Sequence, residues 1–175
     1  KVVANIPYNI TGPLLERLLG RLGRPVERSY KLLVLLVQKE VADRILAKEG
    51  QSNFSALSVR MQLMAKCRSI CDVSPSCFKP PPKVHSKVIA IEPFSAEKHL
   101  EPALAWRIES LLNKAFLSRR KMLRNSLRDV CPMEQLELIA KRVDIDLKQR
   151  PQEISPWSWL ELAKELNSLN SSLKD

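Results

Sequence analysis

The sequence predicts an α/β protein: the second half of a doubly wound sheet, followed by a small all-helical domain. Apolar, strand-like runs alternate with helical patterns as far as Ile91, which is typical of open α/β sheets. The run Lys31–Val37 (KLLVLLV) is apolar after its first residue, as in a strand buried on both faces of a parallel sheet. Composition changes near Pro93, and only helical patterns follow. We therefore expect one structural unit at residues 1–94 and a helical domain at residues 95–175.

Each element of the first unit has its own signal. Val2–Ala4 is strand-like and is followed by a turn. Thr11 is a suitable helix cap, Pro13 suits the first turn, and leucines then recur with helical period. The last two strands are expected to pair as a hairpin. The remaining elements are predicted as a loop at Gly20–Arg28, helices at Gln38–Lys48 and Leu57–Ala65, and strands at Cys67–Val73 and Val84–Ile91.

Apolar faces and one start signal define the helical domain. Ser155 followed by Pro156 is a strong helix start, because serine caps the first turn and proline suits the first helical position. The apolar residues of the final helix are Trp159, Leu162, Ala163 and Leu166. Two earlier faces consist of Leu104, Ile108, Leu111, Leu112, Ala115 and Phe116, and of Leu136, Ile139, Ala140 and Val143.

The chain carries an excess of positive charge. Its formal net charge is +10 and its pI is about 9.7, which favours a polyanionic partner such as nucleic acid. A basic surface that only keeps the protein in solution explains the charge equally well. No segment resembles a signal peptide, and the longest apolar run, Leu32–Val37, is far too short to span a membrane. We expect a soluble, cytoplasmic protein and, by default, a monomer.

The cysteines and histidines do not predict a metal site. No pair of the four cysteines has C-x-x-C spacing, and the two histidines lie at no metal-ligand interval. We expect free thiols in a reducing compartment. The residues concerned are Cys67, Cys71, Cys77, Cys131, His85 and His99.

The tetrapeptide Asn5–Tyr8 (NIPY) directly follows the first strand. The exocyclic amine of adenine is a poor nucleophile, and acceptors for its two N–H groups favour a more reactive, pyramidal nitrogen. The Asn5 side-chain oxygen is one acceptor, and the Ile6 carbonyl, whose direction Pro7 fixes, is another. Tyr8 can stack on the base. An ordinary turn after a strand, where asparagine and proline are common, explains the tetrapeptide as well.

The segment Phe78–Ser86 (FKPPPKVHS) offers a second aromatic ring in a stiff frame. Three consecutive prolines hold an extended rod and exclude a central strand. Phe78 at the start of this rod is a candidate for the other side of a base pocket. The alternative is a proline-rich linker with Phe78 in the core.

A basic cluster with no acidic residue lies at Ala115–Arg128 (AFLSRRKMLRNSLR) and predicts contacts with phosphates. Arg120, Arg124 and Arg128 are spaced i, i+4 and i+8, so we expect them to share one helix face. The alternative is a solvated helix face. The expected cations are Lys114, Arg119, Arg120, Lys121, Arg124 and Arg128, and the expected inward side chains are Phe116, Met122, Leu123 and Leu127.

Six motifs, taken in their order along the chain, resemble those of the KsgA-type ribosomal RNA adenine dimethyltransferases. The bacterial members, and among them the cyanobacterial ones, are the most similar. The motifs run from Asn5 to Leu166, and the ordered set is far more specific than NIPY alone. They are NIPYNIT, VQKEVADRI, LSVRMQ, FKPPPKVHSKV, AFLSRRKMLRNSL and RPQEISPWSWLELAKEL.

This resemblance implies half of a Rossmann-like class I methyltransferase domain at residues 1–94 and an rRNA-binding helical domain after it. It implies transfer of methyl groups from S-adenosylmethionine, without a metal, to N6 of two adjacent adenosines in the 3′-terminal hairpin of small-subunit rRNA. The partner would be an immature 30S subunit. Asn5 would bind the amine and touch the cofactor, the Ile6–Pro7 segment would present the second acceptor, and Tyr8 and Phe78 would stack on the base. The rRNA contacts would come from Arg119, Arg120, Lys121, Arg124 and Arg128.

The sequence departs from the family pattern in three places. His85 stands where an aspartate is usual, and Phe54-Ser55 replaces Tyr-Gly. The third departure concerns the glycine-rich cofactor loop of the family. This sequence shows no such motif, because its four glycines form no G-x-G. We therefore expect the chain to be the C-terminal portion of the enzyme, and expect that it does not by itself bind S-adenosylmethionine measurably.

Three other functions stay open at this point. A DNA adenine methyltransferase with a related N-P-P-Y motif is chemically close, although the later motifs argue against it. A non-catalytic rRNA-binding assembly factor would need only the basic cluster. A metal-binding module is the most distant of the three.

Overall fold

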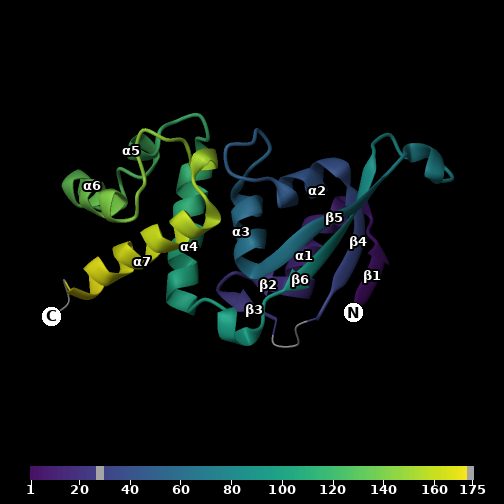
Figure 1. Ribbon diagram of the computed structural model, residues 1–175, viewed down its shortest axis with the longest axis horizontal. Coiled ribbons are helices and arrows are strands. Elements are labelled where there is room, and N and C mark those ends of the chain that lie inside the picture. Colours follow the sequence, from purple (N-terminus) through teal and green to yellow (C-terminus); the bar gives the residue numbers. More distant parts are fainter. Residues whose placement is uncertain (27–29, 173–175) are drawn as a thin grey trace.

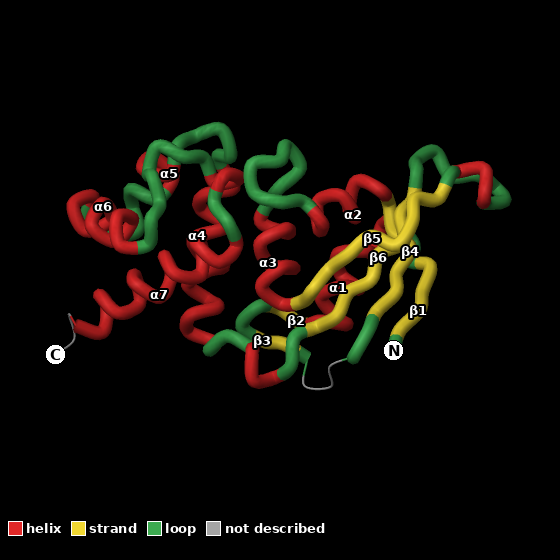
Figure 2. Tube along the Cα trace, in the orientation of Figure 1, coloured by secondary structure: helices red, strands yellow, loops and turns green. Residues whose placement is uncertain are grey.

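A four-stranded mixed sheet occupies one end of the molecule, and a group of helices occupies the other (Figure 1). The structure is a computed structural model and describes residues 1–26 and 30–172. Figure 2 shows the strands gathered beside α1–α3, with α4–α7 beyond them. The predicted α/β class is confirmed.

The sheet has the strand order β1-β4-β6-β5. β1 (Val2–Asn5) pairs in parallel with β4 (Leu33–Gln38), and β6 (Ser86–Pro93) runs antiparallel to both β4 and β5 (Ala65–Val73). The predicted hairpin of the last two strands is therefore confirmed. In β4 the side chains of Leu33, Leu35 and Val37 are fully buried and the alternate ones are half-buried, as expected for a strand covered on both faces.

Three helices accompany the sheet: α1 (Thr11–Leu19), α2 (Lys39–Leu46) and α3 (Ala56–Met64). The prediction that Thr11 caps α1 is wrong. Thr11 already has helical dihedral angles, and its hydroxyl donates back to the Tyr8 carbonyl at 3.3 Å. The 3₁₀ turn Tyr8–Ile10 leads directly into the helix, so no separate capping residue is needed.

The predicted loop at Gly20–Arg28 contains a small hairpin, β2 (Gly20–Arg21) with β3 (Arg24–Pro25). Gly20 has φ +82°, and a Cβ atom there would lie 2.4 Å from the Arg24 carbonyl oxygen. Only glycine meets both conditions. Residues 27 and 28 of that prediction lie outside the described residues.

The second half of the chain is helical, as predicted. The Ser155 prediction is confirmed, because the Ser158 N–H donates to the Ser155 hydroxyl at 3.0 Å at the start of α7. The helices are α4 (Pro102–Leu117), α5 (Leu123–Ser126), α6 (Met133–Arg142) and α7 (Pro156–Ser172). Further 3₁₀ turns lie at Pro75–Cys77, Ala96–Lys98 and Pro151–Glu153.

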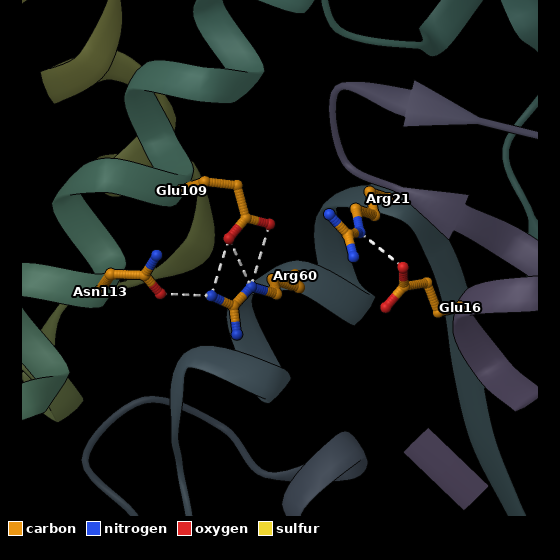
Figure 3. Close-up of polar contacts among 5 residues, drawn as sticks. All are labelled: Glu16, Arg21, Arg60, Glu109 and Asn113. Carbon is orange, nitrogen blue, oxygen red and sulfur yellow. Dashed lines mark hydrogen bonds and ion pairs between the residues drawn. The ribbon is translucent and has the colours of Figure 1, made fainter. Parts of the chain in front are cut away.

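Helix α3 belongs to two packed cores at once. Met61 lies in the core under the sheet, whereas Val59 and Leu63 pack with the α4–α7 core around Trp159. On the surface the Arg60 guanidinium reaches Glu109 at 2.7 Å and Asn113 at 2.8 Å, both on α4 (Figure 3). Figure 3 also shows a second ion pair nearby, between Arg21 and Glu16. The sequence boundary near residue 94 therefore does not separate two independent cores.

No helix within residues 1–26 and 30–172 has the length and apolar character to cross a membrane.

Candidate functional site

The NIPY segment lies at the edge of the sheet where the parallel strands end. Asn5 is the last residue of β1 and is paired in register with Leu36 of β4. Its side chain is exposed. Open α/β sheets bind ligands beyond this edge. The structure therefore places the predicted asparagine at the position where such a fold builds its sites.

The backbone after Asn5 is fixed, but its acceptor groups are free. The Ile6 N–H donates to the Leu36 carbonyl at 3.1 Å, and Ile6 as a whole residue is 1% exposed. Pro7 is extended, with φ −55° and ψ 131°. Within the part of the chain that the structure describes, neither the side-chain amide of Asn5 nor the backbone carbonyl of Ile6 has a hydrogen-bond partner. Two unpartnered acceptors thus follow one another along the chain, of which that of Asn5 lies on an exposed residue and that of Ile6 on a buried one.

A hydrogen bond joins the two predicted halves of the base pocket. Tyr8 opens the 3₁₀ turn after β1, is half-buried, and its hydroxyl lies 2.6 Å from the Ser86 hydroxyl. Ser86 ends the FKPPPKVHS segment and begins β6. Because β4 lies between β1 and β6, this bond spans the width of the central strand.

Phe78 lies farther out than the tyrosine. It follows the 3₁₀ turn Pro75–Cys77, and its N–H donates to the Pro75 carbonyl at 3.1 Å. Figure 1 shows the segment between β5 and β6 extending beyond the end of the sheet. Phe78 is half-buried, and among the described residues Tyr8 and Phe78 make no ring contact. The role of Phe78 in a base pocket stays a prediction.

A network of two lysines and two aspartates holds α2 against β5 and β6 at this edge. The Lys87 ammonium lies 2.5 Å from Asp43 of α2 and 3.4 Å from Asp72 of β5. Lys39 at the start of α2 also bonds Asp72, and its N–H donates to the His85 carbonyl at 3.0 Å. No local pattern in the sequence indicates this network, because its four side chains come from three separate elements.

The network makes stability depend on pH. The hydrogen bond from Lys39 holds the pKa of Asp72 below its ordinary value, with Lys87 acting in the same direction and desolvation opposing both. A carboxyl whose pKa is lower in the folded state contributes stability above its unfolded pKa of about 3.9, and this contribution is lost as pH falls through the folded value. We expect stability to fall more steeply below about pH 4 in the parent chain than in Asp72→Asn. Urea unfolding at a series of pH values measures this, and equal slopes would contradict it.

The predicted helix through the basic cluster is interrupted. α4 ends at Leu117, and a turn closed by the Lys121 N–H on the Ser118 carbonyl at 2.8 Å leads to the extended Met122. Arg120, Arg124 and Arg128 therefore do not share one helix face, and Met122 is 44% exposed rather than inward. Leu123 and Leu127 are buried, and Phe116 packs on the core, as predicted.

Hydrogen bonds to backbone carbonyls instead join three loops at this place. The Arg119 guanidinium donates to the Ser52 carbonyl, and the Leu123 N–H donates to the Gln149 carbonyl at 2.8 Å. The Gly50 N–H donates to the Gln152 carbonyl at 2.8 Å. These contacts gather cations that are far apart in the sequence, which no local pattern could reveal. We call this set the basic loop surface: Lys48, Arg119, Arg120, Lys121, Arg124, Lys148 and Arg150.

Two of the predicted cations are not counted in that surface. Arg128 pairs with its neighbour Asp129 at 3.5 Å, and Lys114 lies on the last turn of α4. In Figure 1 the loops of the basic loop surface and the carboxyl ends of the strands both lie toward the upper side of the view.

Metal ligands are not assembled in the described part of the chain. No group of three or more His, Cys, Asp or Glu side chains there is arranged to hold an ion. Burial raises the pKa of the Cys67 thiol to about 12, so this thiol is neutral at ordinary pH.

Comparison with known proteins gives consistent matches. A model of the family described as ribosomal RNA adenine dimethylase matches residues 1–168. The chain is 66% identical over 167 residues to ribosomal RNA small subunit methyltransferase A of Prochlorococcus marinus (strain MIT 9313), covering 95% of this chain and 60% of that protein. It is 61% identical over 172 residues to the protein of the same name from Synechococcus sp. (strain WH7803), covering 98% of this chain and 61% of that one. The chain thus spans about three fifths of the length of these curated relatives.

Solved structures show the same fold. A dimethyladenosine transferase from Plasmodium falciparum superposes with a TM-score of 0.79 at 26% identity, over 97% of this chain and 68% of that one. The 23S rRNA methyltransferase ErmE superposes with a TM-score of 0.69 at 23% identity, over 94% of this chain and 64% of that one. The second likeness shows the fold alone.

Proposed function

The chain belongs to the ribosomal RNA adenine dimethylase family, and we propose that it supplies the adenine-binding side of a small-subunit rRNA methyltransferase. The reaction would place two methyl groups on N6 of each of two adjacent adenosines in the 3′-terminal hairpin, during assembly of the small subunit in the cytoplasm. The observation that carries this proposal is the pair of unpartnered acceptors at Asn5 and Ile6, beside a tyrosine held in place.

Methyl transfer from a sulfonium is a direct displacement, so the protein must align the amine and hydrogen-bond it. The Asn5 side-chain oxygen and the Ile6 carbonyl would accept the two N–H groups of the target adenine. S-Adenosylmethionine supplies the methyl group when it is bound. The exposed Asn5 at the strand end fits the sulfonium end of the cofactor. A neutral amide oxygen can lie near the sulfonium without removing its methyl group.

Stacking would hold the base in the plane of these acceptors. Tyr8 begins the turn after Pro7, so its ring lies next to the acceptor pair along the chain. Phe78 would cover the opposite face, carried by the stiff proline segment that follows it. Because the base must leave its stack in the RNA, aromatic contacts of this kind offset part of the cost of extrusion.

The basic loop surface would bind rRNA phosphates at a distance from the reacting base. Arg120, Lys121 and Arg124 are exposed and make no ion pair within the described residues, so phosphates need not displace acidic partners. Phosphate contacts give affinity and register, and the NIPY edge would select the base. Arg119, which bonds the Ser52 carbonyl, and Arg128 are the other members of the predicted RNA-binding set.

A chimera tests the function. The segment of the Prochlorococcus marinus relative that the chain matches is replaced by the chain itself, and the product is assayed on immature small subunits and on duplex DNA. Mass spectrometry of digested rRNA is expected to show N6,N6-dimethyladenosine. Methylation of the DNA alone would overturn the rRNA assignment, and tight rRNA binding without transfer would indicate an assembly factor instead.

Charge reversal at the basic loop surface is expected to weaken rRNA binding. The double substitution Arg120→Glu and Lys121→Glu should lower affinity and reduce the slope of log K against log salt by about 1.5–2, because two phosphate contacts are lost. The matched control is the double substitution Lys31→Glu and Lys66→Glu, which makes the same change in net charge. Both lysines are exposed and lie at the opposite edge of the sheet. Filter binding at several salt concentrations measures both. Equal losses in the two variants would contradict a localised surface.

A further inference from the structure

Ser86 is a buried polar residue with one side-chain partner. It is 0% exposed, and only Thr11 and Ser58 share the combination of polarity and burial among the described residues. Its hydroxyl lies 2.6 Å from the Tyr8 hydroxyl, within the normal range for an O–H···O bond. The Ser58 hydroxyl donates to the Arg44 carbonyl, 14 positions earlier in the chain, whereas the bond of Ser86 joins residues 78 positions apart.

The backbone around Ser86 is fixed from both sides. Ser86 pairs with Gln38 of β4 and with Val73 of β5, so it lies inside the sheet. The preceding carbonyl, of His85, accepts the Lys39 N–H at 3.0 Å, and the following side chain, of Lys87, is bound to Asp43. The Ser86 hydroxyl is therefore a rigid point at the edge that carries the NIPY segment.

Tyr8, by contrast, lies on a short turn after an outer strand of the sheet. A tyrosine ring has two rotatable bonds, and its hydroxyl oxygen lies on the axis of the second. Holding the hydroxyl therefore fixes the direction of that axis, and a phenolic O–H, which prefers to bond in the plane of its ring, then favours one orientation of the ring about it. Holding the ring before the base arrives removes the cost of ordering it at the moment of binding.

We propose that Ser86 is a positioning residue that holds the Tyr8 ring in its stacking orientation for the target adenine. This inference rests on the proposed function, because it assigns a purpose to a ring that stacks. Under this inference Ser86 contributes to binding of the target base through Tyr8, although Ser86 itself does not contact the substrate.

Kinetics of the chimera test the proposal. Because rRNA affinity would come from phosphates bound at the basic loop surface, loss of ring orientation should lower kcat about five- to tenfold with KM for RNA within about twofold. Ser86→Ala and Tyr8→Phe each remove one hydroxyl of the pair, and each is expected to show this effect. The double variant should be no slower than either single one, since the same bond is removed.

Ser58→Ala is the matched control. It makes the same substitution at a serine that is equally buried, and it should lower the melting temperature without changing kcat. Losses of kcat that add in the double variant would overturn the proposal. So would a Ser86→Ala variant that has a lower melting temperature and an unchanged kcat, as expected for Ser58→Ala.

A spectroscopic measurement separates failure of this inference from failure of the proposed function. The chain has two tyrosines, so ¹³C-tyrosine labelling gives signals from Tyr8 and, as an internal reference, Tyr30. Ser86→Ala should shift the Tyr8 ring signals and leave those of Tyr30 in place, whether or not the chimera methylates rRNA. Unchanged Tyr8 signals would overturn the positioning role. An inactive chimera with shifted Tyr8 signals would overturn only the proposed function.

Discussion

Replacement of Asn5 by alanine is expected to lower methyl transfer by the chimera at least about a hundredfold, the usual loss when a hydrogen bond to the reacting group is removed. The amide lies at the carboxyl edge and bonds no other described residue, so nothing in the fold depends on it. The loss should appear in kcat, with rRNA affinity and the melting temperature unchanged. Methylation under single-turnover conditions is the measurement.

Asn9→Ala provides the control for this prediction. Asn9 is also an exposed asparagine, four positions later in the 3₁₀ turn Tyr8–Ile10. It should retain full activity. An Asn5→Ala variant within about threefold of the parent rate would show that the acceptor pair does not carry the reaction, since a lost hydrogen bond to the reacting group costs far more.

Trp159→Ala is expected to give the largest loss of stability, about 3–5 kcal/mol. Trp159 is 0% exposed in the α4–α7 core, and its ring centroid lies 6.2 Å from that of Phe116. Alanine would leave a cavity that neighbouring helices can close only partly. Since small domains are stable by about 5–15 kcal/mol, this single change would remove a large share of the total. Urea unfolding followed by circular dichroism is the measurement.

Two further variants define the cause of that loss. Trp157→Ala removes an indole that is 57% exposed two positions earlier, and should change stability by no more than about 0.5 kcal/mol. Trp159→Phe should cost far less than alanine, because the Trp159 indole nitrogen is buried without a partner among the described residues and phenylalanine removes it. Equal losses for Trp157→Ala and Trp159→Ala would contradict the assignment of the core.

Much of the fold could be predicted because its signals are local. The apolar run before Gln38 indicates a covered strand, and Ser155-Pro156 indicates a helix start, since each depends on residues within one or two turns. The order of motifs gave the family for the same reason. The position of Asn5 at a strand end also followed from the sequence, because the strand signal stops directly before NIPY.

The errors have physical causes that a single segment does not reveal. The i, i+4, i+8 spacing of the arginines is compatible with a helix, but the chain breaks at Met122 so that Leu123 can pair with the loop at Gln149. Thr11 has the right side chain for a cap, but a preceding turn already continues into the helix. The Lys87 network, the Ser86 bond and the additional cations of the basic loop surface depend on tertiary contacts. Spacing along the chain carries no information about them.

The shared helix α3 has a consequence for how a substrate would be chosen. Helix α3 lies in both cores and is joined to α4 by Arg60. The basic loop surface and the NIPY edge are therefore held at a fixed distance from each other. An RNA bound at the basic loop surface presents to the NIPY edge only a base that lies at this distance from the bound phosphates. Under the proposed function, the choice among the many adenosines of an rRNA would then depend on distance along a folded hairpin as well as on the chemistry of adenine.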